Sequence, residues 1–321
     1  MPVTIKMIAK KTGLSAGTVS QALRDDPRMA EATRAKVMNA AQRMGYVPSD
    51  FGRALRSGKS RMIGYIHSDI TKSFYGNIMK GIADEAARNG YGILFAAPSN
   101  DTACEIEQIK YLEQKKVEGI IIAGCEPETW DYLDSLNRNG PPVVISSNPS
   151  QRKDIEEVIT DDLEGGRMVA SYLIGLGHSR LAYYNSSGMS NSRRDGFFSE
   201  VKKHDLPLPV VCDSIESLKK LLKRRNRPTA IFAYNDMNAV DVIDTADDIG
   251  IKVPEALSVI GYNDDVYSSF KRINLTTLRQ QKDEIGRLSF INLLKKINGE
   301  KIESVSLKPK LIIRGSTGRL I

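Results

Sequence analysis

The chain has 321 residues, of which 41% are hydrophobic, values typical of a soluble globular protein with two or three domains. No apolar run approaches the roughly 20 residues of a membrane span, and the first residues lack the apolar stretch of a signal peptide. We therefore expect a cytoplasmic protein without a membrane anchor. The three cysteines, Cys104, Cys125 and Cys212, are far apart, which argues against a disulfide framework or a zinc site.

The net charge of +7 is unevenly distributed along the chain. Residues 1–61 contain twelve Lys or Arg and four Asp or Glu, a net charge of +8, whereas the remaining residues have a net charge of −1. A basic segment joined to a nearly neutral remainder is typical of a nucleic-acid-binding domain. The alternative is a solvated basic tail, although the segment is not of low complexity.

Residues 1–48 have the pattern of a small helical domain. An amphipathic first helix ends at Gly13, Ser15 is placed to cap a second helix, and a third helix ends at Gly45. Two short helices joined by a tight glycine turn predict a helix-turn-helix, whose second helix enters the major groove of DNA. A structural three-helix bundle that does not bind DNA is the alternative, and the charge distribution favours DNA.

The second predicted helix begins with small and hydroxyl-bearing side chains. Ala16 and Gly17 allow close approach to base edges, and Gln21 can form a two-point contact with adenine. The hydroxyl groups nearby can donate to phosphate oxygens, and the helix N-terminus itself favours anions. We expect DNA contacts from ten residues of this domain: Thr4, Lys6, Ser15, Ala16, Gly17, Thr18, Ser20, Gln21, Arg24 and Thr33.

The stretch VTIKMIAKKTGLSAGTVSQAL, followed by TRAKVMNAAQRMGYVP, resembles the N-terminal domain of the lactose/galactose repressor family of bacterial transcription regulators. The resemblance continues to the C-terminus. It implies that Ala16, Gly17 and Gln21 are the base-reading positions. The family usually has Arg where this chain has Gln21, so we expect its preferred operator to differ from the usual one.

Residues 49–60 are expected to form a hinge helix and a linker. The helical part spans barely two turns, which is too short to be stable alone in water. The resemblance implies that it folds when paired across a dimer on DNA, with Leu55 wedged into the minor groove, where an apolar side chain can kink the duplex. Arg53 and Arg56 suit nearby phosphates, and Ser49 is a further expected DNA contact. The alternative is that Leu55 packs on the rest of the protein.

From Met62 the pattern changes to strands alternating with amphipathic helices, and the series restarts after residue 162. This repeated β–α pattern predicts an α/β body with parallel sheets, in two similar subdomains separated by a cleft. The resemblance implies a fold like that of periplasmic binding proteins. We expect the effector-binding and dimerisation body at 61–321, with a first subdomain at about 61–159 plus about 283–306 and a second at about 160–282 plus about 307–321.

The candidate ligand residues lie where predicted strands end, which is where sheets of this type bind ligands. These loops combine amide, carboxylate, hydroxyl, guanidinium and aromatic groups, a mixture that suits a polyhydroxy ligand. They span residues 67–75, 146–148, 186–197, 234–238 and 261–265. The resemblance implies ligand contacts from Phe74, Tyr75, Ser147, Arg193, Asn235, Asp236, Asn263 and Asp264.

Two of these positions depart from the family pattern, because Ser147 and Asn263 stand where an Asp is common. An Asn donates a hydrogen bond and carries no charge. The sequence therefore favours a ligand with an acceptor or a negative group at Asn263, with Arg193 as the counter-charge. The alternative is that Asp264 turns inward and restores an ordinary sugar site.

Each candidate also has a purely structural alternative. Asp236 could cap a helix that starts at Met237, Asn263 and Asp264 could form only a turn, and Arg193 could form a surface ion pair. Taken together, five polar loops at matching strand ends favour a ligand site.

These observations predict a sequence-specific transcription regulator, a repressor, whose operator affinity is controlled by a sugar or sugar derivative in the cleft. The expected partners are double-stranded DNA with a pseudo-palindromic operator, a carbohydrate-like effector, and a second copy of the chain in a homodimer. The alternatives are control by a protein partner, a sugar-binding receptor without a DNA role, and an enzyme. No nucleotide-binding or nucleophile motif is present and the three histidines are isolated, so we expect no catalysis, no cofactor and no metal.

Overall fold

The structure is a computed structural model, and it describes residues 3–24, 26–47, 58–67, 69, 73–98, 102–124, 127–149, 152, 154–186, 188 and 192–320. The chain divides into two compact units, Met1–Ser60 and Arg61–Ile321, which are termed the head and the body below. None of the described helices combines the length and the apolar composition needed to span a bilayer.

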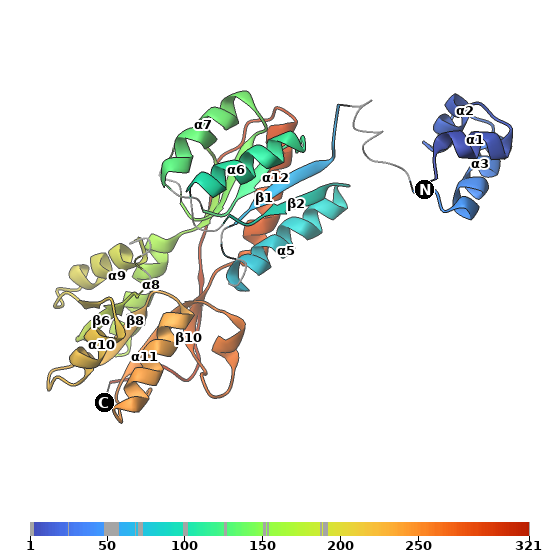
Figure 1. The fold of residues 1–321 in the computed structure, drawn as a ribbon. Helices are drawn as coiled ribbons and strands as arrows, with labels where there is room; N and C mark the ends of the chain where they lie inside the picture. The colour runs from blue at the N-terminus through green and yellow to red at the C-terminus, as the bar shows by residue number, and fades with distance from the viewer. Residues whose placement is uncertain are drawn as a thin grey trace. The chain divides into compact units, whose positions relative to one another are not determined.

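The described part of the head contains three helices packed together, Ile5–Thr12 (α1), Ala16–Ala22 (α2) and Glu31–Met44 (α3) (Figure 1). Gly13 ends α1 in the left-handed conformation, with φ of 71°, and Gly45 ends α3 in the same way, with φ of 68°. Both positions favour glycine because a side chain is strained there. A small core closes the unit and consists of Ile8, Val19, Ala22, Val37 and Ala41. The predicted helix-turn-helix is confirmed.

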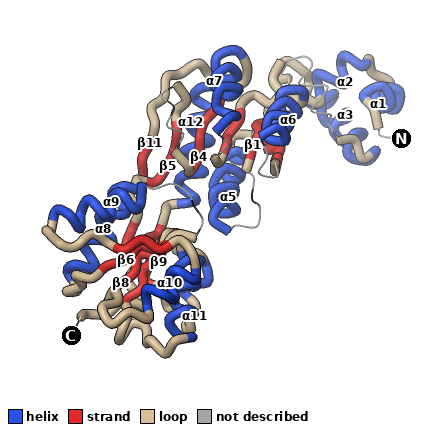
Figure 2. Tube along the Cα trace, turned by 60° about the vertical axis from the view of Figure 1, so that its left-hand side comes forward, coloured by secondary structure: helices blue, strands red, loops and turns tan. Residues whose placement is uncertain are grey.

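The first sheet of the body has six parallel strands in the order β11-β5-β4-β3-β1-β2. Helices α5 and α12 cover one face, and α6 and α7 cover the other (Figure 2). The strands are Met62–Ile66 (β1), Gly92–Ala96 (β2), Ile120–Ile122 (β3), Val143–Ser147 (β4), Glu157–Thr160 (β5) and Val305–Leu307 (β11). The helices are Ser73–Arg88 (α5), Thr102–Gln114 (α6), the short Pro127–Thr129 (η1), Trp130–Asn139 (α7) and Lys282–Ile297 (α12).

The second sheet repeats this three-layer arrangement in the order β12-β10-β9-β8-β6-β7. Helices α8 and α9 pack on one face, and α10 and α11 pack on the other. The strands are Leu181–Tyr184 (β6), Val210–Cys212 (β7), Ala230–Ala233 (β8), Ser258–Asn263 (β9), Thr276–Arg279 (β10) and Lys310–Ile312 (β12). The helices are Asp162–Gly175 (α8), Ser192–Lys203 (α9), Ile215–Leu222 (α10), Asp236–Asp248 (α11) and the short Val266–Ser269 (η2).

The helix pairs α5–α12 and α8–α9 cross with their backbones in near contact. A Cβ added at Gly81 of α5 would clash with the carbonyl oxygen of Asp283 in α12, and one added at Gly166 of α8 would clash with that of Arg193 in α9. Glycine is therefore required at both crossings. The second crossing fixes the first turn of α9 and so positions Arg193.

The predicted fold class is confirmed, with two differences of detail. The sequence analysis did not identify α12. It also did not identify the short strands β7, β10, β11 and β12, because three or four residues are too few to show a period. The second sheet is also not wholly parallel, since β12 runs antiparallel to β10. The subdomain boundaries themselves remain predictions.

Candidate nucleic-acid interface and ligand site

Hydroxyl groups cap both helices of the helix-turn-helix. The Thr4 Oγ1 accepts a hydrogen bond from the Met7 amide at 3.3 Å, at the start of α1. The Ser15 Oγ accepts one from the Thr18 amide at 3.0 Å, at the start of α2, which confirms the predicted cap. The hydroxyls of Ser15 and Thr18 also lie 2.8 Å apart. Ser15 is exposed and Thr18 half-buried at the helix start, where phosphate oxygens would bind.

Helix α2 has one buried face and one exposed face. Val19 and Ala22 are buried against α1 and α3, whereas Ala16, Gly17 and Gln21 are exposed. A Cβ at Gly17 would meet only the Ser15 Oγ, at an ordinary distance of 3.6 Å. The fold therefore does not require glycine here. The small size of Gly17 instead leaves space on the exposed surface of α2.

The other predicted DNA contacts of the head differ in how exposed they are. Lys6 and Arg24 are exposed, and the Arg24 Nε donates to the Ser20 carbonyl oxygen at 3.0 Å. Thr33 is half-buried in the first turn of α3. The predicted hinge contacts fall outside the described residues, and they are Ser49, Arg53, Leu55 and Arg56.

In the body, an aromatic pair begins α5. The rings of Phe74 and Tyr75 meet edge to face at 4.9 Å, and the His67 ring stacks on Tyr75 at 3.4 Å. The Asn148 Nδ2, next to Ser147, donates to the Tyr75 hydroxyl at 3.4 Å. Burial raises the pKa of this hydroxyl, and the positive charge of Arg193 acts in the opposite direction. Tyr75 is therefore close both to Asn148, which follows a strand of the first sheet, and to Arg193 of α9, which packs on the second sheet.

Several buried hydroxyl groups in the described part of the body have no hydrogen-bond partner, among them those of Tyr65, Ser147 and Tyr183. Ser147 ends β4 with a φ of 72°, a conformation uncommon for residues other than glycine. Tyr65 lies in β1 and Tyr183 in β6, each on the face covered by the close helix pair. An unpaired buried hydroxyl costs roughly 1–3 kcal/mol, so such groups indicate a place for water or ligand.

Arg193 is buried and interacts with three residues, Asp162 of α8, Tyr234 just after β8 and Tyr262 of β9. Its Nε donates to the Asp162 Oδ2 at 3.0 Å, and its Nη1 donates to the Tyr234 carbonyl oxygen at 2.8 Å. The guanidinium lies 4.6 Å from the centre of the Tyr234 ring and 3.9 Å from that of Tyr262. Burial disfavours the charge, yet the nearby Asp162 keeps the pKa of Arg193 above its ordinary value. The surface ion pair considered from sequence is thus a buried one.

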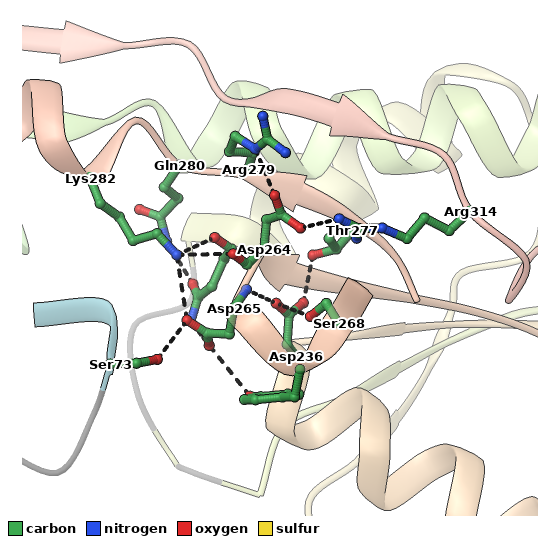
Figure 3. A network of polar contacts seen from close by, with 12 residues as sticks. Ser73, Asp236, Asp264, Asp265, Ser268, Thr277, Arg279, Gln280, Lys282 and Arg314 are labelled. Carbon is green, nitrogen blue, oxygen red and sulfur yellow. Dashed lines mark hydrogen bonds and ion pairs between the residues drawn. The ribbon is translucent and has the colours of Figure 1, made fainter. Parts of the chain in front are cut away.

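Asn263 and Asp264 differ in what they face. The Asn263 Oδ1 accepts a hydrogen bond from the Gln280 Nε2 at 2.7 Å. The two carboxylate oxygens of Asp264 pair with Arg279 at 2.6 Å and Arg314 at 2.7 Å (Figure 3). Burial opposes ionisation of Asp264, but these two arginines hold its pKa below the usual value. Asp264 is turned toward the arginines and supplies no free carboxylate.

Asn235 and Asp236 have structural contacts. The Asn235 Oδ1 caps α11 by accepting from the Asn238 amide at 2.8 Å, so the idea that Asp236 caps a helix starting at Met237 is wrong. Asp236 is fully buried and joins the loop after β9 to η2 and β10, as seen in Figure 3. It accepts from the backbone N–H of Asp265 at 2.6 Å and from the hydroxyls of Ser268 at 2.7 Å and Thr277 at 2.5 Å. Burial raises its pKa to about 6.

Ser147 and Asn263 end strands β4 and β9, and Phe74, Tyr75 and Arg193 lie in the first turns of α5 and α9. These five residues are termed the strand-end cluster. Phe74 approaches Asn263 through Lys282, whose Nζ lies 5.9 Å from the Phe74 ring centre and 2.8 Å from the Asn263 carbonyl oxygen.

Sequence reasoning missed three ionisable residues next to this cluster: Asp162, Asp265 and Lys282. Only Asp265 carried a signal, since it lies within the loop 261–265 chosen from the sequence. The other two lie in the first turns of helices and meet their partners through the tertiary fold.

A groove of about 720 Å³ lies elsewhere, between α8 and α9. Its charged side chains pair with one another, as Arg167 does with Glu164 at 3.6 Å and Lys203 with Glu200 at 3.7 Å. None of the residues predicted to bind a ligand lines it.

Comparisons with known proteins agree with this description. Two family models match, "Bacterial regulatory proteins, lacI family" over residues 4–49 and "Periplasmic binding protein-like domain" over residues 170–317. The HTH-type transcriptional regulator DegA of Bacillus subtilis (strain 168) is 32% identical, with 100% of this chain and 99% of DegA covered.

Two solved structures have the same fold. The Lac repressor dimer bound to operator and the anti-inducer ONPF superposes with a TM-score of 0.90, at 23% identity, over 99% of this chain and 100% of that one. A LacI family transcriptional regulator from Enterococcus faecium with bound ribose has a TM-score of 0.71, at 25% identity, over 81% of this chain and 100% of that one.

Proposed function

Because the chain belongs to the LacI family of bacterial regulatory proteins, we propose that it is a sequence-specific DNA-binding repressor whose operator affinity is controlled by a small molecule. The exposed face of α2 carries this proposal. Its residues Ala16, Gly17 and Gln21 leave room for base edges, and its capped N-terminus suits a phosphate. The protein acts as a homodimer on a pseudo-palindromic operator, because one head buries too little surface for tight specific binding.

Binding to DNA from the region next to its own gene tests this function. Fluorescence anisotropy would compare that fragment with a shuffled fragment of the same length and composition. We expect the native fragment to bind at least roughly 10³-fold more tightly at physiological salt. Equal affinity for the two fragments would contradict sequence-specific recognition. A palindromic footprint would support the dimer.

The small molecule binds at the strand-end cluster of the body. Arg193 and Asn263 offer donors to ligand oxygens, and Phe74 and Tyr75 cover an apolar face of the ligand. The unpaired hydroxyl of Ser147 supports a polar ligand at this place. The ribose-bound relative supports a carbohydrate-like effector. A thermal-shift screen of neutral sugars and sugar derivatives identifies the class, with Arg193→Ala as a variant expected to lose the response.

The hinge belongs to the same proposal through the family pattern. Leu55 wedges into the minor groove at the operator centre, flanked by Arg53 and Arg56. Leu55→Ala is expected to weaken operator binding and reduce DNA bending while leaving effector binding unchanged. An unchanged bend angle, measured by gel mobility of circularly permuted operator fragments, would show that Leu55 is not the wedge.

A further inference from the structure

The cationic side chains around the strand-end cluster are paired with carboxylates of the same chain. Arg193 pairs with Asp162 at 3.0 Å, and Lys282 pairs with Asp265 at 3.4 Å. A third carboxylate, Asp264, pairs with two arginines. Arg193 and Lys282 are thus each matched by a carboxylate of the chain itself, in contrast to the sequence-based idea that Arg193 is the counter-charge of an acidic ligand.

Lys282 has no donor left for a ligand. Its ammonium group has three N–H bonds, and three acceptors surround it. These are the carbonyl oxygens of Asn263 at 2.8 Å and Asp264 at 3.1 Å, and the Asp265 carboxylate. The Lys282 side chain is 8% exposed, so water does not substitute for these contacts.

The carboxylate of Asp265 occupies the place where an anion would bind. Four donors converge on it, from α5, α12, the end of β9 and η2 (Figure 3). The Ser73 hydroxyl, at the start of α5, and the Lys282 ammonium donate to its Oδ1 at 3.1 and 3.4 Å. The Asn263 amide and the Tyr267 hydroxyl donate to its Oδ2, each at 3.4 Å. A hydroxyl, an ammonium, an amide and a phenol around one point form the kind of site that holds a carboxylate or phosphate ligand.

The same contacts fix the orientation of Asn263. Its amide nitrogen faces Asp265, because an ionised carboxylate only accepts hydrogen bonds. Its carbonyl oxygen then faces the Gln280 amide, whose own oxygen accepts from the Thr160 hydroxyl at 2.7 Å. Asp265 thus fixes the direction of donation along a chain of hydrogen bonds that runs through Asn263 and Gln280 to Thr160, at the end of β5.

We propose that Asp265 is a specificity-determining residue, an internal anion that makes the site select a neutral polyhydroxy effector and exclude acidic ones. This inference rests on the proposed function, because it concerns the effector site of that regulator. An acidic effector would meet the charge of Asp265 and would find each nearby cation already paired. A neutral sugar meets no such repulsion, and its hydroxyls can both donate and accept.

The test replaces Asp265 and asks whether the site gains affinity for anions. Asp265→Ala removes the internal carboxylate and leaves the Lys282 ammonium and the Ser73 hydroxyl to a small anion. The probe is inorganic phosphate at constant ionic strength, and thermal unfolding of the full chain is followed by the fluorescence of Trp130. This is the chain's single tryptophan and lies in α7, so the signal reports the body rather than the basic head.

We expect phosphate to give no saturable stabilisation of the parent body. The Asp265→Ala variant is expected to gain about 3 °C in Tm when phosphate is at roughly ten times its Kd. Asp265→Asn, which keeps the shape and loses the charge, serves if the Ala variant fails to fold, and it should gain a smaller response. Asp248→Asn is the matched control, because it removes a surface carboxylate paired with Lys219 at 3.2 Å and should gain nothing.

Two outcomes would overturn the inference: saturable phosphate stabilisation of the parent protein, or no gain in either Asp265 variant. A second arm uses matched probes, D-galactose and D-galacturonate, by calorimetric titration. Tighter binding of D-galacturonate than of D-galactose by the parent would also overturn the inference. Tighter binding of D-galactose by the parent, with a smaller difference in affinity in Asp265→Asn, supports it. Operator binding measured on the same samples separates the two proposals, since a protein that binds its operator but fails these tests loses only this inference.

Discussion

The head and the body of this protein treat polar side chains in opposite ways. In the head, Ser15 and Gln21 are exposed on a short helix, and the unit carries most of the excess positive charge. In the body, Arg193 and Asp265 are each 8% exposed and bound to partners within the chain. A surface that binds a long, charged partner needs exposed polar side chains and an excess of positive charge. A site for a small neutral ligand needs donors and acceptors that are held in fixed positions, with their charges paired within the chain.

The largest expected difference between the two regions is their response to salt. Operator affinity should fall by about 0.9 in log units per log unit of salt for each phosphate neutralised, or roughly 10³–10⁵-fold between 50 and 200 mM for six to ten contacts. Binding of a neutral sugar by the body should change little, because its charges are paired and buried. Anisotropy titrations and calorimetry over this salt range measure both. An operator affinity that does not change with salt concentration would show that the basic head is not the DNA-binding surface.

The next effect concerns the helix crossing that holds Arg193. Gly166→Val is expected to destabilise the body by about 3 kcal/mol, because its side chain would push against the Arg193 carbonyl oxygen. Gly175→Ala in the same helix is the control, since its Cβ would meet no atom within 4 Å. Its stability should stay within about 1 kcal/mol of the parent's. Denaturant unfolding followed by far-UV circular dichroism measures both, and equal effects would show that α8 and α9 do not cross so closely.

A smaller and more local effect is expected on the exposed face of α2. Gln21→Ala should cost about 1–3 kcal/mol of operator binding and relax preference at one base pair in each half-site. Thermal stability should be unchanged, because Gln21 is exposed and packs in no core. Binding to operators carrying each base at that position gives the measurement. A uniform loss across all four bases would assign Gln21 to the phosphate backbone instead.

The smallest effect is a pH dependence confined to the body. The pKa of Asp236 is about 6 in the folded protein and lies near 3.8 when the carboxyl group is free. Between about pH 4 and pH 6 the Asp236 carboxyl is therefore protonated in the folded protein and ionised in the unfolded chain. Its contribution to the free energy of unfolding is greatest below about pH 4 and declines as pH rises to about 6. The slope is at most about 1.4 kcal/mol per pH unit.

Asp236→Asn provides the comparison for that pH dependence. The variant cannot titrate, so the stability difference between parent and variant should shrink as pH rises from 4 to 6 and stay constant above 7. Urea unfolding at four or five pH values tests this. A difference that grows with pH in this range would mean that the buried carboxyl is ionised throughout.

How much the sequence determined differs between the two regions for a physical reason. In the head, the glycine turn at Gly13, the Ser15 cap and the exposed front of α2 followed from spacing within about 20 residues, because helix caps and turns are governed by local backbone rules. In the body, the alternating strands and helices and the polar loops at strand ends were also readable. Resemblance supplied the positions of Phe74 and Arg193.

The pairing of charges around the strand-end cluster was decided by the tertiary structure alone. Asp162 and Arg193 are 31 positions apart, and Ser73 and Asp265 are 192 positions apart, so no local pattern relates them. The sequence placed Asn263 and Asp264 in the right loop but could not show that Asp264 faces two arginines while Asp265, one residue on, faces Lys282. Which carboxylate meets which cation depends on the left-handed backbone at Asn263 and Asp264 and on the packing of α12 beside that loop. The contact with α12 joins residues distant in the sequence and so arises only in the tertiary fold.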